Sequence, residues 1–333
     1  MSAVLDPRAI EEEIARIREK ESNPYSSGTK TNIFTLLVFR SNAPGPGQAD
    51  HAETALQFLL GKRPARIITI RRASAPHTEA WVSGRCFPDR RNRGVCFEEV
   101  HIESGDDGMG ADPGAWSPLV IRDLPVFAWM PDGLREESAE WTPALSGSAG
   151  LIDKLLVDSS RGDAPEIESL RALQGLRDAA ADGFLVSDFA WRRGKVLREQ
   201  SARAFDPAEM RPLLSSVKAV RLYGGSRMEA WLYFQWLGTR LGRDIPAEHA
   251  WEGPLAEGFR LTFTIDGSAA VDIGCTKGGC LSRGEEKGGY RFPADGEILL
   301  EEVDTLSRDA VFSQVLAGGH PVPAPHPQGS PGA

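Results

Sequence analysis

Apolar residues run almost without interruption through several short segments of this chain. Such runs are typical of strands that are covered on both faces. The segments are 31–40, 64–70, 125–130 and 151–159. Between the first two, residues 48–63 place their apolar positions at helical spacing. The alternation of strands with helical or loop segments predicts an α/β domain in the first half of the chain.

Two further patterns predict antiparallel hairpins. EAWVSGRCF and GVCFEEVHIES, within residues 79–104, flank the polar loop PDRRNRG. In FRLTFTIDGSAAVDIG, Asp266-Gly267 forms a two-residue turn, and four residues alternate toward the interior. Those four are Phe259, Leu261, Phe263 and Ile265. The first hairpin makes the sheet of the N-terminal half mixed rather than purely parallel.

The second half repeats the mixture of helices and strands. We expect helices over 165–181 and 187–206, a strand over 216–223, and a helix that begins near Ser226. A strand near 297–303 and a helix over 305–317 follow. The fold class is therefore α/β, with two domains whose mixed sheets are flanked by helices, the second being α/β or α+β.

These elements divide the chain into four parts. We expect an N-terminal helix and linker (1–30), an N-terminal α/β domain (31–164), a C-terminal α/β or α+β domain (165–317) and a disordered Pro/Gly-rich tail (318–333). The length of 333 residues agrees with about two domains.

Charge narrows the class of partner. The chain carries 47 acidic and 38 basic residues, a formal net charge of −9. Nucleic acid and anionic membranes attract basic faces, so neither is expected as a partner. No apolar run approaches the roughly 18 residues of a membrane span, and the N-terminus does not resemble a signal peptide. We expect a cytoplasmic protein.

The stretch VRLYGGSRMEAW, residues 220–231, has the pattern of a strand, a glycine turn and a helix start. Such a turn can hold a phosphate, and it nearly matches a nucleophile elbow with Ser226 as the nucleophile. However, Met228 replaces the last glycine of the elbow, and Glu229 completes a capping box with Ser226. The pattern therefore favours a structural cap over a site.

Other candidate chemistry is sparse. Cys86 and Cys96 are spaced C-x9-C, and Cys275 and Cys280 are spaced C-x4-C, unlike the tight pairs of a zinc ribbon. We interpret them as buried free thiols, with a redox-responsive pair at 275 and 280 as the alternative. No dinucleotide-binding, P-loop or metal-binding histidine motif occurs. We expect no cofactor, no metal and no catalytic residues, which favours a binding or regulatory protein over an enzyme.

Six stretches carry a resemblance to a known family. They are KRPARIITI, GVCFEEVHIES, DLPVFAWMPD, DKLLVDSS, SDFAWRRGKVLREQSARAFD and YGGSRMEAWLYFQWLGTRLG. In this order they resemble the OpcA family, the glucose-6-phosphate dehydrogenase assembly proteins. The resemblance implies two domains and a non-enzymatic protein that binds this dehydrogenase and favours its active state in the oxidative pentose phosphate pathway. It implies no catalytic residues.

Two segments are candidates for binding the partner. Trp129 lies at the tip of a strand bounded by prolines, and SDFAWRRGKVLR combines tryptophan with arginines, as interface centres do. In the second segment Asp188 is expected to cap a helix on which Trp191 and Lys195 share a face. The candidate residues are Trp129, Asp188, Trp191, Arg192 and Arg193. The alternative is that both tryptophans belong to the core.

A second function stays open. The 224–229 turn could serve a small hydrolase or a sugar-phosphate-binding protein, and an exposed Ser226 near His249 would favour the hydrolase. A closed capping box would not.

Overall fold

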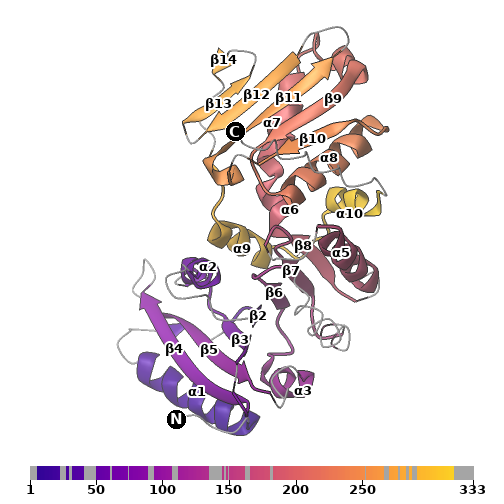
Figure 1. Cartoon of the computed structure of the whole chain (residues 1–333). Coiled ribbons are helices and arrows are strands. Elements are labelled where there is room, and N and C mark those ends of the chain that lie inside the picture. The colour runs from indigo at the N-terminus through magenta and orange to yellow at the C-terminus, as the bar shows by residue number, and fades with distance from the viewer. Residues whose placement is uncertain are drawn as a thin grey trace, which may run out of the picture. The chain divides into compact units, whose positions relative to one another are not determined.

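The computed structural model of the chain, shown in Figure 1, describes most of both halves. The described residues are 6–22, 28–29, 32–40, 50–60, 62–73, 75–88, 94–106, 112–134, 145, 148, 150–161, 166–180, 183–251, 253–265, 270–276, 278–282, 285–286 and 291–318. The tail expected to be disordered and the Asp266-Gly267 turn lie almost entirely outside these ranges.

The chain forms two compact units, each assembled from more than one stretch of sequence. Unit 1 comprises residues 1–164, 175–188 and 294–308. Unit 2 comprises residues 165–174, 189–293 and 309–333. The C-terminal part of the chain therefore contributes to both units.

Unit 1 is built on an eight-stranded mixed sheet in the order β1-β5-β3-β2-β6-β7-β8, with β4 paired to β5. The strands are β1 Gly28–Thr29, β2 Thr35–Arg40, β3 Arg66–Arg72, β4 Glu79–Pro88, β5 Gly94–Ser104, β6 Val126–Met130, β7 Lys154–Val157 and β8 Leu185–Asp188. Among the described strands of this sheet, only β4 is antiparallel to its neighbour. Strand β2 lies at the centre and is buried at every position, as its apolar run predicts.

Unit 1 also contains several described helices. They are α1 Pro7–Ser22, α2 His51–Leu59, α3 Pro113–Trp116 with the short helix η2 Ser117–Leu119, and α9 Asp295–Val303; α5 Glu166–Ala180 is shared between the units. Helix α1 lies along β4 and β5 (Figure 1). Helices α2 and α9 contact each other. At this contact Gly296 of α9 lies so close to the side chain of Phe58 in α2 that a Cβ atom would not fit.

The strand expected near 297–303 is wrong, because this segment is helix α9. Its buried residues Ile298, Leu299 and Val303 repeat at helical spacing rather than alternating. The Glu297 side chain also accepts a hydrogen bond from the backbone of Ala294, which secures the first turn.

Unit 2 has a six-stranded mixed sheet in the order β10-β9-β11-β12-β13-β14. The strands are β9 Val217–Tyr223, β10 Ala247–Ala250, β11 Gly258–Ile265, β12 Ala270–Thr276, β13 Gly279–Ser282 and β14 Glu285–Glu286. The predicted hairpin is confirmed: β11 and β12 are antiparallel, and the four residues of β11 expected to face inward are all buried. With two mixed sheets flanked by helices, the predicted α/β fold class is also confirmed.

The described helices of unit 2 are α6 Phe189–Arg193, α7 Lys195–Phe205, α8 Arg227–Leu241 and α10 Ala310–Ala317, with the short helices η4 Arg211–Ser216 and η5 Leu255–Glu257. Of these helices, α7 and α8 share a core with this sheet, whereas α6 and α10 pack on α8. Helix α8 is apolar on nearly every side, and its residues from Met228 to Gln235 are all buried. Its Tyr233, together with Phe205 of α7 and Phe263 of β11, belongs to one core cluster.

The single helix expected over 187–206 is wrong in two respects. Strand β8 runs to Asp188, and a break at Gly194 separates α6 from α7. Asp188 directly precedes α6, and its carboxylate accepts hydrogen bonds from the backbone N–H and the hydroxyl of Ser159, at 3.0 and 2.7 Å; its role as a helix cap stays a prediction. Trp191 and Lys195 therefore stand on different helices. Parallel pairing of β8 with β7 has overridden the local helical pattern.

Within the part of the chain that the structure describes, no helix is both long and apolar enough to span a membrane.

Candidate functional site

The sheet of unit 1 has a point at which the strand order reverses. From β2 the chain proceeds to β3 and β5 on one side, and then returns to β6 on the other side of β2 before continuing to β7 and β8. In open α/β sheets, ligands bind outside the carboxyl ends of the strands at such a switch point. Here the adjacent carboxyl ends belong to β2, which finishes at Arg40, and to β6, which leads into Asp132.

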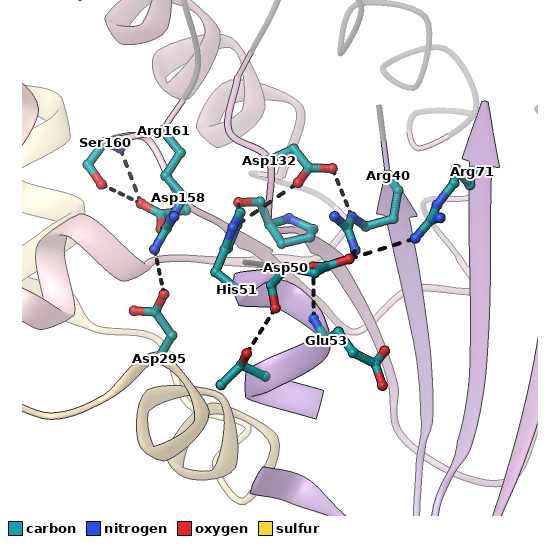
Figure 2. Close-up of polar contacts among 12 residues, drawn as sticks. Arg40, Asp50, His51, Glu53, Arg71, Asp132, Asp158, Ser160, Arg161 and Asp295 are labelled. Carbon is teal, nitrogen blue, oxygen red and sulfur yellow. Dashed lines mark hydrogen bonds and ion pairs between the residues drawn. The ribbon is translucent and has the colours of Figure 1, made fainter. Parts of the chain in front are cut away.

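Arg40 and Asp132 are joined directly across this point. The Arg40 Nε donates to Asp132 Oδ2 at 2.9 Å, and its Nη1 donates to Asp50 Oδ2 at 3.1 Å. Figure 2 shows the guanidinium between the two carboxylates. The arginine side chain is only 4% exposed, so this charge is held inside the unit by two acidic partners.

Electrostatics at this cluster favours the charged forms. Burial opposes the charge of Arg40, but the hydrogen bonds and attraction from Asp132 and Asp50 outweigh it and raise the pKa of Arg40. Burial likewise opposes the charge of Asp50. The backbone N–H of Glu53 and the Arg40 guanidinium, with Arg71 further away, together lower the pKa of Asp50. The ion pairs are therefore formed at neutral pH.

Two more side chains extend the cluster (Figure 2). His51, the first residue of α2, donates from Nε2 to the carbonyl oxygen of Pro131 at 3.1 Å and lies 3.9 Å from Asp132 Oδ1. Arg71, near the end of β3, places its Nη2 3.9 Å from Asp50 Oδ2. Asp50 is also the N-cap of α2, so one carboxylate fixes the helix start and holds a strand-end arginine.

A second polar network follows β7. Asp158 accepts from the Ser160 hydroxyl at 2.7 Å and from Arg161 Nε at 2.8 Å, and Arg161 Nη2 reaches Asp295 at 2.8 Å. Figure 2 shows this network as well. It ties the loop after β7 to the first residue of α9. Both networks satisfy their charges with groups of the same unit, so they hold the loops at the carboxyl edge in place. Among the described residues, no group of three potential ligands is placed to hold a metal ion.

The turn at residues 224–229 is closed by its own side chains. The Ser226 backbone N–H donates to Glu229 Oε2 at 2.8 Å, and the Glu229 N–H donates to Ser226 Oγ at 3.1 Å. Glu229 also accepts from Arg193 Nε at 2.9 Å. Gly224 and Gly225 have φ of 90° and 79°, which requires glycine here. The predicted capping box is confirmed.

His249 lies beside this turn. Its Nε2 donates to the carbonyl oxygen of Gly225 at 3.1 Å. Burial lowers the pKa of His249, against the opposing effect of its backbone hydrogen bonds. The imidazole therefore holds the glycine turn as a neutral donor, while the Ser226 hydroxyl is engaged in the cap. The closed capping box therefore favours a structural role of the 224–229 turn over a role as the nucleophile site of a hydrolase.

The five candidate residues for partner binding lie in both units. Trp129 and Asp188 belong to unit 1, and Trp191, Arg192 and Arg193 belong to unit 2. Trp129 is 1%, Asp188 0% and Trp191 2% exposed, whereas the two arginines are half-buried. Their role in partner binding stays a prediction. The burial of both tryptophans agrees with the alternative that they belong to the core.

Trp191 has a specific set of neighbours within unit 2. Its Nε1 donates to Asp309 Oδ2 at 2.8 Å, its ring lies against Phe312, and the Arg198 guanidinium stands 3.4 Å from its ring centre. These contacts hold α6 to the start of α10 and to α7.

The interpretation of the cysteines as free thiols is wrong for one pair. Cys275 and Cys280 are directly opposite on β12 and β13, with Cα atoms 4.1 Å apart, and they form a disulfide. The register of the two strands brings the two side chains together. Cys86 and Cys96 are opposite on β4 and β5. Their side chains lie outside the described part of the structure.

The sequence interpretation missed the cluster at the switch point. A signal was present, because Arg40, Arg71, Asp132 and Asp158 each follow or end an apolar strand. A charged residue at such a position marks the carboxyl edge of a parallel sheet. Which of these residues would meet depends on the strand order, and that is not visible in the sequence.

Comparison with known proteins places the chain in a family. The family model described as glucose-6-phosphate dehydrogenase subunit N-terminal domain matches residues 58–174. The model described as the C-terminal domain of the same subunit matches residues 185–316.

The chain belongs to the OpcA family. Two curated OpcA proteins are similar to it, both named putative OxPP cycle protein OpcA. The one from a Synechocystis strain is 24% identical over 220 residues, which cover 64% of this chain and 44% of the relative. The one from Synechococcus elongatus is 27% identical over 181 residues, covering 54% of this chain and 39% of the relative. This OpcA-family chain thus matches less than half the length of either relative.

Proposed function

We propose that this protein is a non-enzymatic assembly factor that binds glucose-6-phosphate dehydrogenase and favours its active state, in the oxidative pentose phosphate pathway of the cytoplasm. The observation that carries the proposal is the match of both OpcA-family models, in order, to the two halves of the chain. The names of the two relatives, which refer to the same pathway, support it.

The mechanism is a shift of population. A binding protein activates an enzyme when it binds the active conformation or oligomer more tightly than the inactive one, and thereby raises the occupancy of the active form. Nothing in this mechanism requires a reacting side chain in the activator.

The closed turn at 224–229 also supports a binding protein. It is the stretch whose sequence comes nearest to a catalytic or phosphate-binding motif. In the structure the backbone N–H groups of Ser226 and Glu229 and the serine hydroxyl are engaged by the capping box. A carboxylate, Glu229, stands where an anionic ligand would have to bind.

The test uses the purified dehydrogenase of the same organism. Glucose-6-phosphate-dependent reduction of the dinucleotide is measured with and without the protein, and sedimentation gives the oligomer distribution of the dehydrogenase. We expect a lower KM or a higher kcat, together with a co-sedimenting complex. A dehydrogenase whose kinetics and sedimentation are unchanged at micromolar concentrations of the protein would contradict the proposal.

The candidate residues can be tested in the same assay. Of the five, Arg192 and Arg193 reach the surface of their unit, and Arg193 also pairs with Glu229, so Arg192→Glu is the informative variant. Arg203→Glu, on the exposed side of α7, is the matched control. If this segment contacts the dehydrogenase, Arg192→Glu weakens activation and Arg203→Glu does not. Equal activation by both variants would remove the segment from the interface.

A further inference from the structure

The outer face of the sheet in unit 2 is hollowed. The inner face shares a core with α7 and α8, and polar residues dominate the outer one. Strands β10, β9, β11 and β12 lie side by side (Figure 1), and residues that pair across neighbouring strands point to the same side. The outward rows are Glu248–Arg221–Thr262–Asp272, Tyr223–Arg260 and Ala219–Thr264. Together they line a hollow of about 390 Å³, which is the size of a small-ligand pocket.

The hollow exists because short side chains stand next to long ones. Side chains project roughly perpendicular to a sheet, so their lengths set the relief of its surface. Ala219, Thr262 and Thr264 are short, whereas Arg221 and Arg260 are long. The short side chains therefore form the floor of the hollow, and the two arginines form part of its rim.

The two arginines meet at one tyrosine ring. The Arg260 guanidinium lies over Tyr223, with Cζ 4.1 Å from the ring centre. Arg221 Nη1 donates to Tyr223 Oη at 3.2 Å, and Arg221 Nε donates to Glu248 Oε2 at 2.5 Å. A guanidinium has five N–H donors, so Arg221 keeps donors for a ligand after these contacts. Two positive groups held at one point form a place for an anion.

Asp272 supplies an acceptor on the next strand. Its Oδ1 accepts from the Thr262 hydroxyl at 2.7 Å. A carboxylate can accept about four hydrogen bonds, so Asp272 retains acceptor capacity toward the hollow. The hollow thus combines cationic donors on β9 and β11 with an anionic acceptor on β12.

This combination selects a class of ligand. Asp272 repels a bare anion, and a neutral sugar leaves the two guanidiniums without an anionic partner. A ligand that satisfies both sides carries an anionic group and several hydroxyl groups. A phosphate ester has more terminal oxygens than a carboxylate and so suits two guanidiniums better.

We propose that this hollow binds a small phosphorylated sugar, with its phosphate at Arg221 and Arg260 and its hydroxyl groups donating to Asp272. The inference concerns a ligand of unit 2 and goes beyond the proposed function, on which it does not depend. Tyr223 and Glu248 orient the donors before the ligand arrives, which lowers the entropic cost of binding.

The first experiment measures binding to the full-length protein by calorimetry. The ligands are glucose 6-phosphate, ribose 5-phosphate and inorganic phosphate. We expect at least one of the sugar phosphates to bind more tightly than inorganic phosphate, because only a sugar offers hydroxyl groups to Asp272. No binding of either sugar phosphate at millimolar concentrations overturns the inference.

Three variants then test the assigned contacts. Arg260→Gln should weaken binding of the sugar phosphate at least tenfold. Asp272→Asn should weaken it several-fold but should not weaken inorganic phosphate, since the variant loses a hydroxyl acceptor and a repelling charge together. Arg240→Gln, at the exposed end of α8, is the matched control and should bind within twofold of the wild type. All three side chains are exposed, and thermal unfolding checks that each variant is folded.

Two results of this series contradict the inference. One is an Arg260→Gln protein that binds the sugar phosphate as tightly as Arg240→Gln does. The other is an Asp272→Asn protein in which inorganic phosphate is weakened as much as the sugar phosphate. Neither result bears on the proposed function, because no dehydrogenase is present in these titrations.

Discussion

Ser226 and Glu229 close the start of α8 by exchanging hydrogen bonds, each side chain accepting from the backbone N–H of the other residue. This reciprocal pair uses the donors that a phosphate would need and the hydroxyl that a hydrolase would need. A stretch that is ambiguous in the sequence is thereby explained as the beginning of the most buried helix of unit 2. The pair also stabilises the fold in a measurable way.

We expect Ser226→Ala to destabilise the protein by about 1 kcal/mol, the usual effect of losing an N-cap side chain. Ser226→Asp keeps an acceptor at the cap and serves as the control, with a smaller loss. Urea unfolding followed by circular dichroism measures both. A wild-type midpoint for Ser226→Ala would mean that the cap contributes nothing to stability.

Arg40→Ala should cost much more than removal of an exposed arginine. It leaves Asp50 and Asp132 without their shared buried partner, and the loss of one member of a buried ion pair costs about 3 kcal/mol or more. Arg63→Ala breaks the half-exposed pair with Asp304 and should cost less than about 1 kcal/mol. The free energy of unfolding is measured for both variants. Equal destabilisation by Arg40→Ala and Arg63→Ala would show that the switch-point cluster has no special role in stability.

Asp50 should make stability depend on pH in the acid range. Its pKa in the folded state is lowered, so its contribution is fully present above the unfolded value of about 3.9 and is lost as the pH falls through the folded pKa. Asp50→Asn keeps the N-cap but has no charge to titrate. Thermal melts between pH 7 and pH 3 should show the difference between wild type and variant shrinking as the pH falls. A difference that is constant with pH would contradict the direction of the shift.

Two glycine substitutions should have opposite signs. A Cβ on Gly296 would lie 2.4 Å from Phe58 Cβ, so Gly296→Ala must push α9 from α2 and should cost about 1–3 kcal/mol. A Cβ on Gly175, exposed in α5, meets nothing within 4 Å. Gly175→Ala should therefore stabilise by about 0.5–1 kcal/mol, since alanine favours a helix. Denaturant unfolding tests both, and two changes of the same sign would contradict the packing seen here.

The local pattern of apolar and polar residues determines many of the strands and helix starts of this protein. Continuous apolar runs such as 35–40 produced buried parallel strands, and strict alternation in 259–265 produced the inner face of a hairpin. The capping box was also readable, because its two side chains are only three residues apart. The family resemblance required the order of several such segments and no knowledge of their arrangement.

Tertiary structure decided what local pattern leaves open. Residues 187–188 end strand β8 instead of starting the expected helix, because they pair with β7 in the sheet. Cys275 and Cys280 form a disulfide because the strand register sets them opposite each other. The cluster of Arg40 and Asp132, 92 positions apart in the sequence, exists because the strand order reverses at β2. The sequence by itself determines contacts between near neighbours, whereas these long-range contacts arise only when the sheet brings its strand ends together.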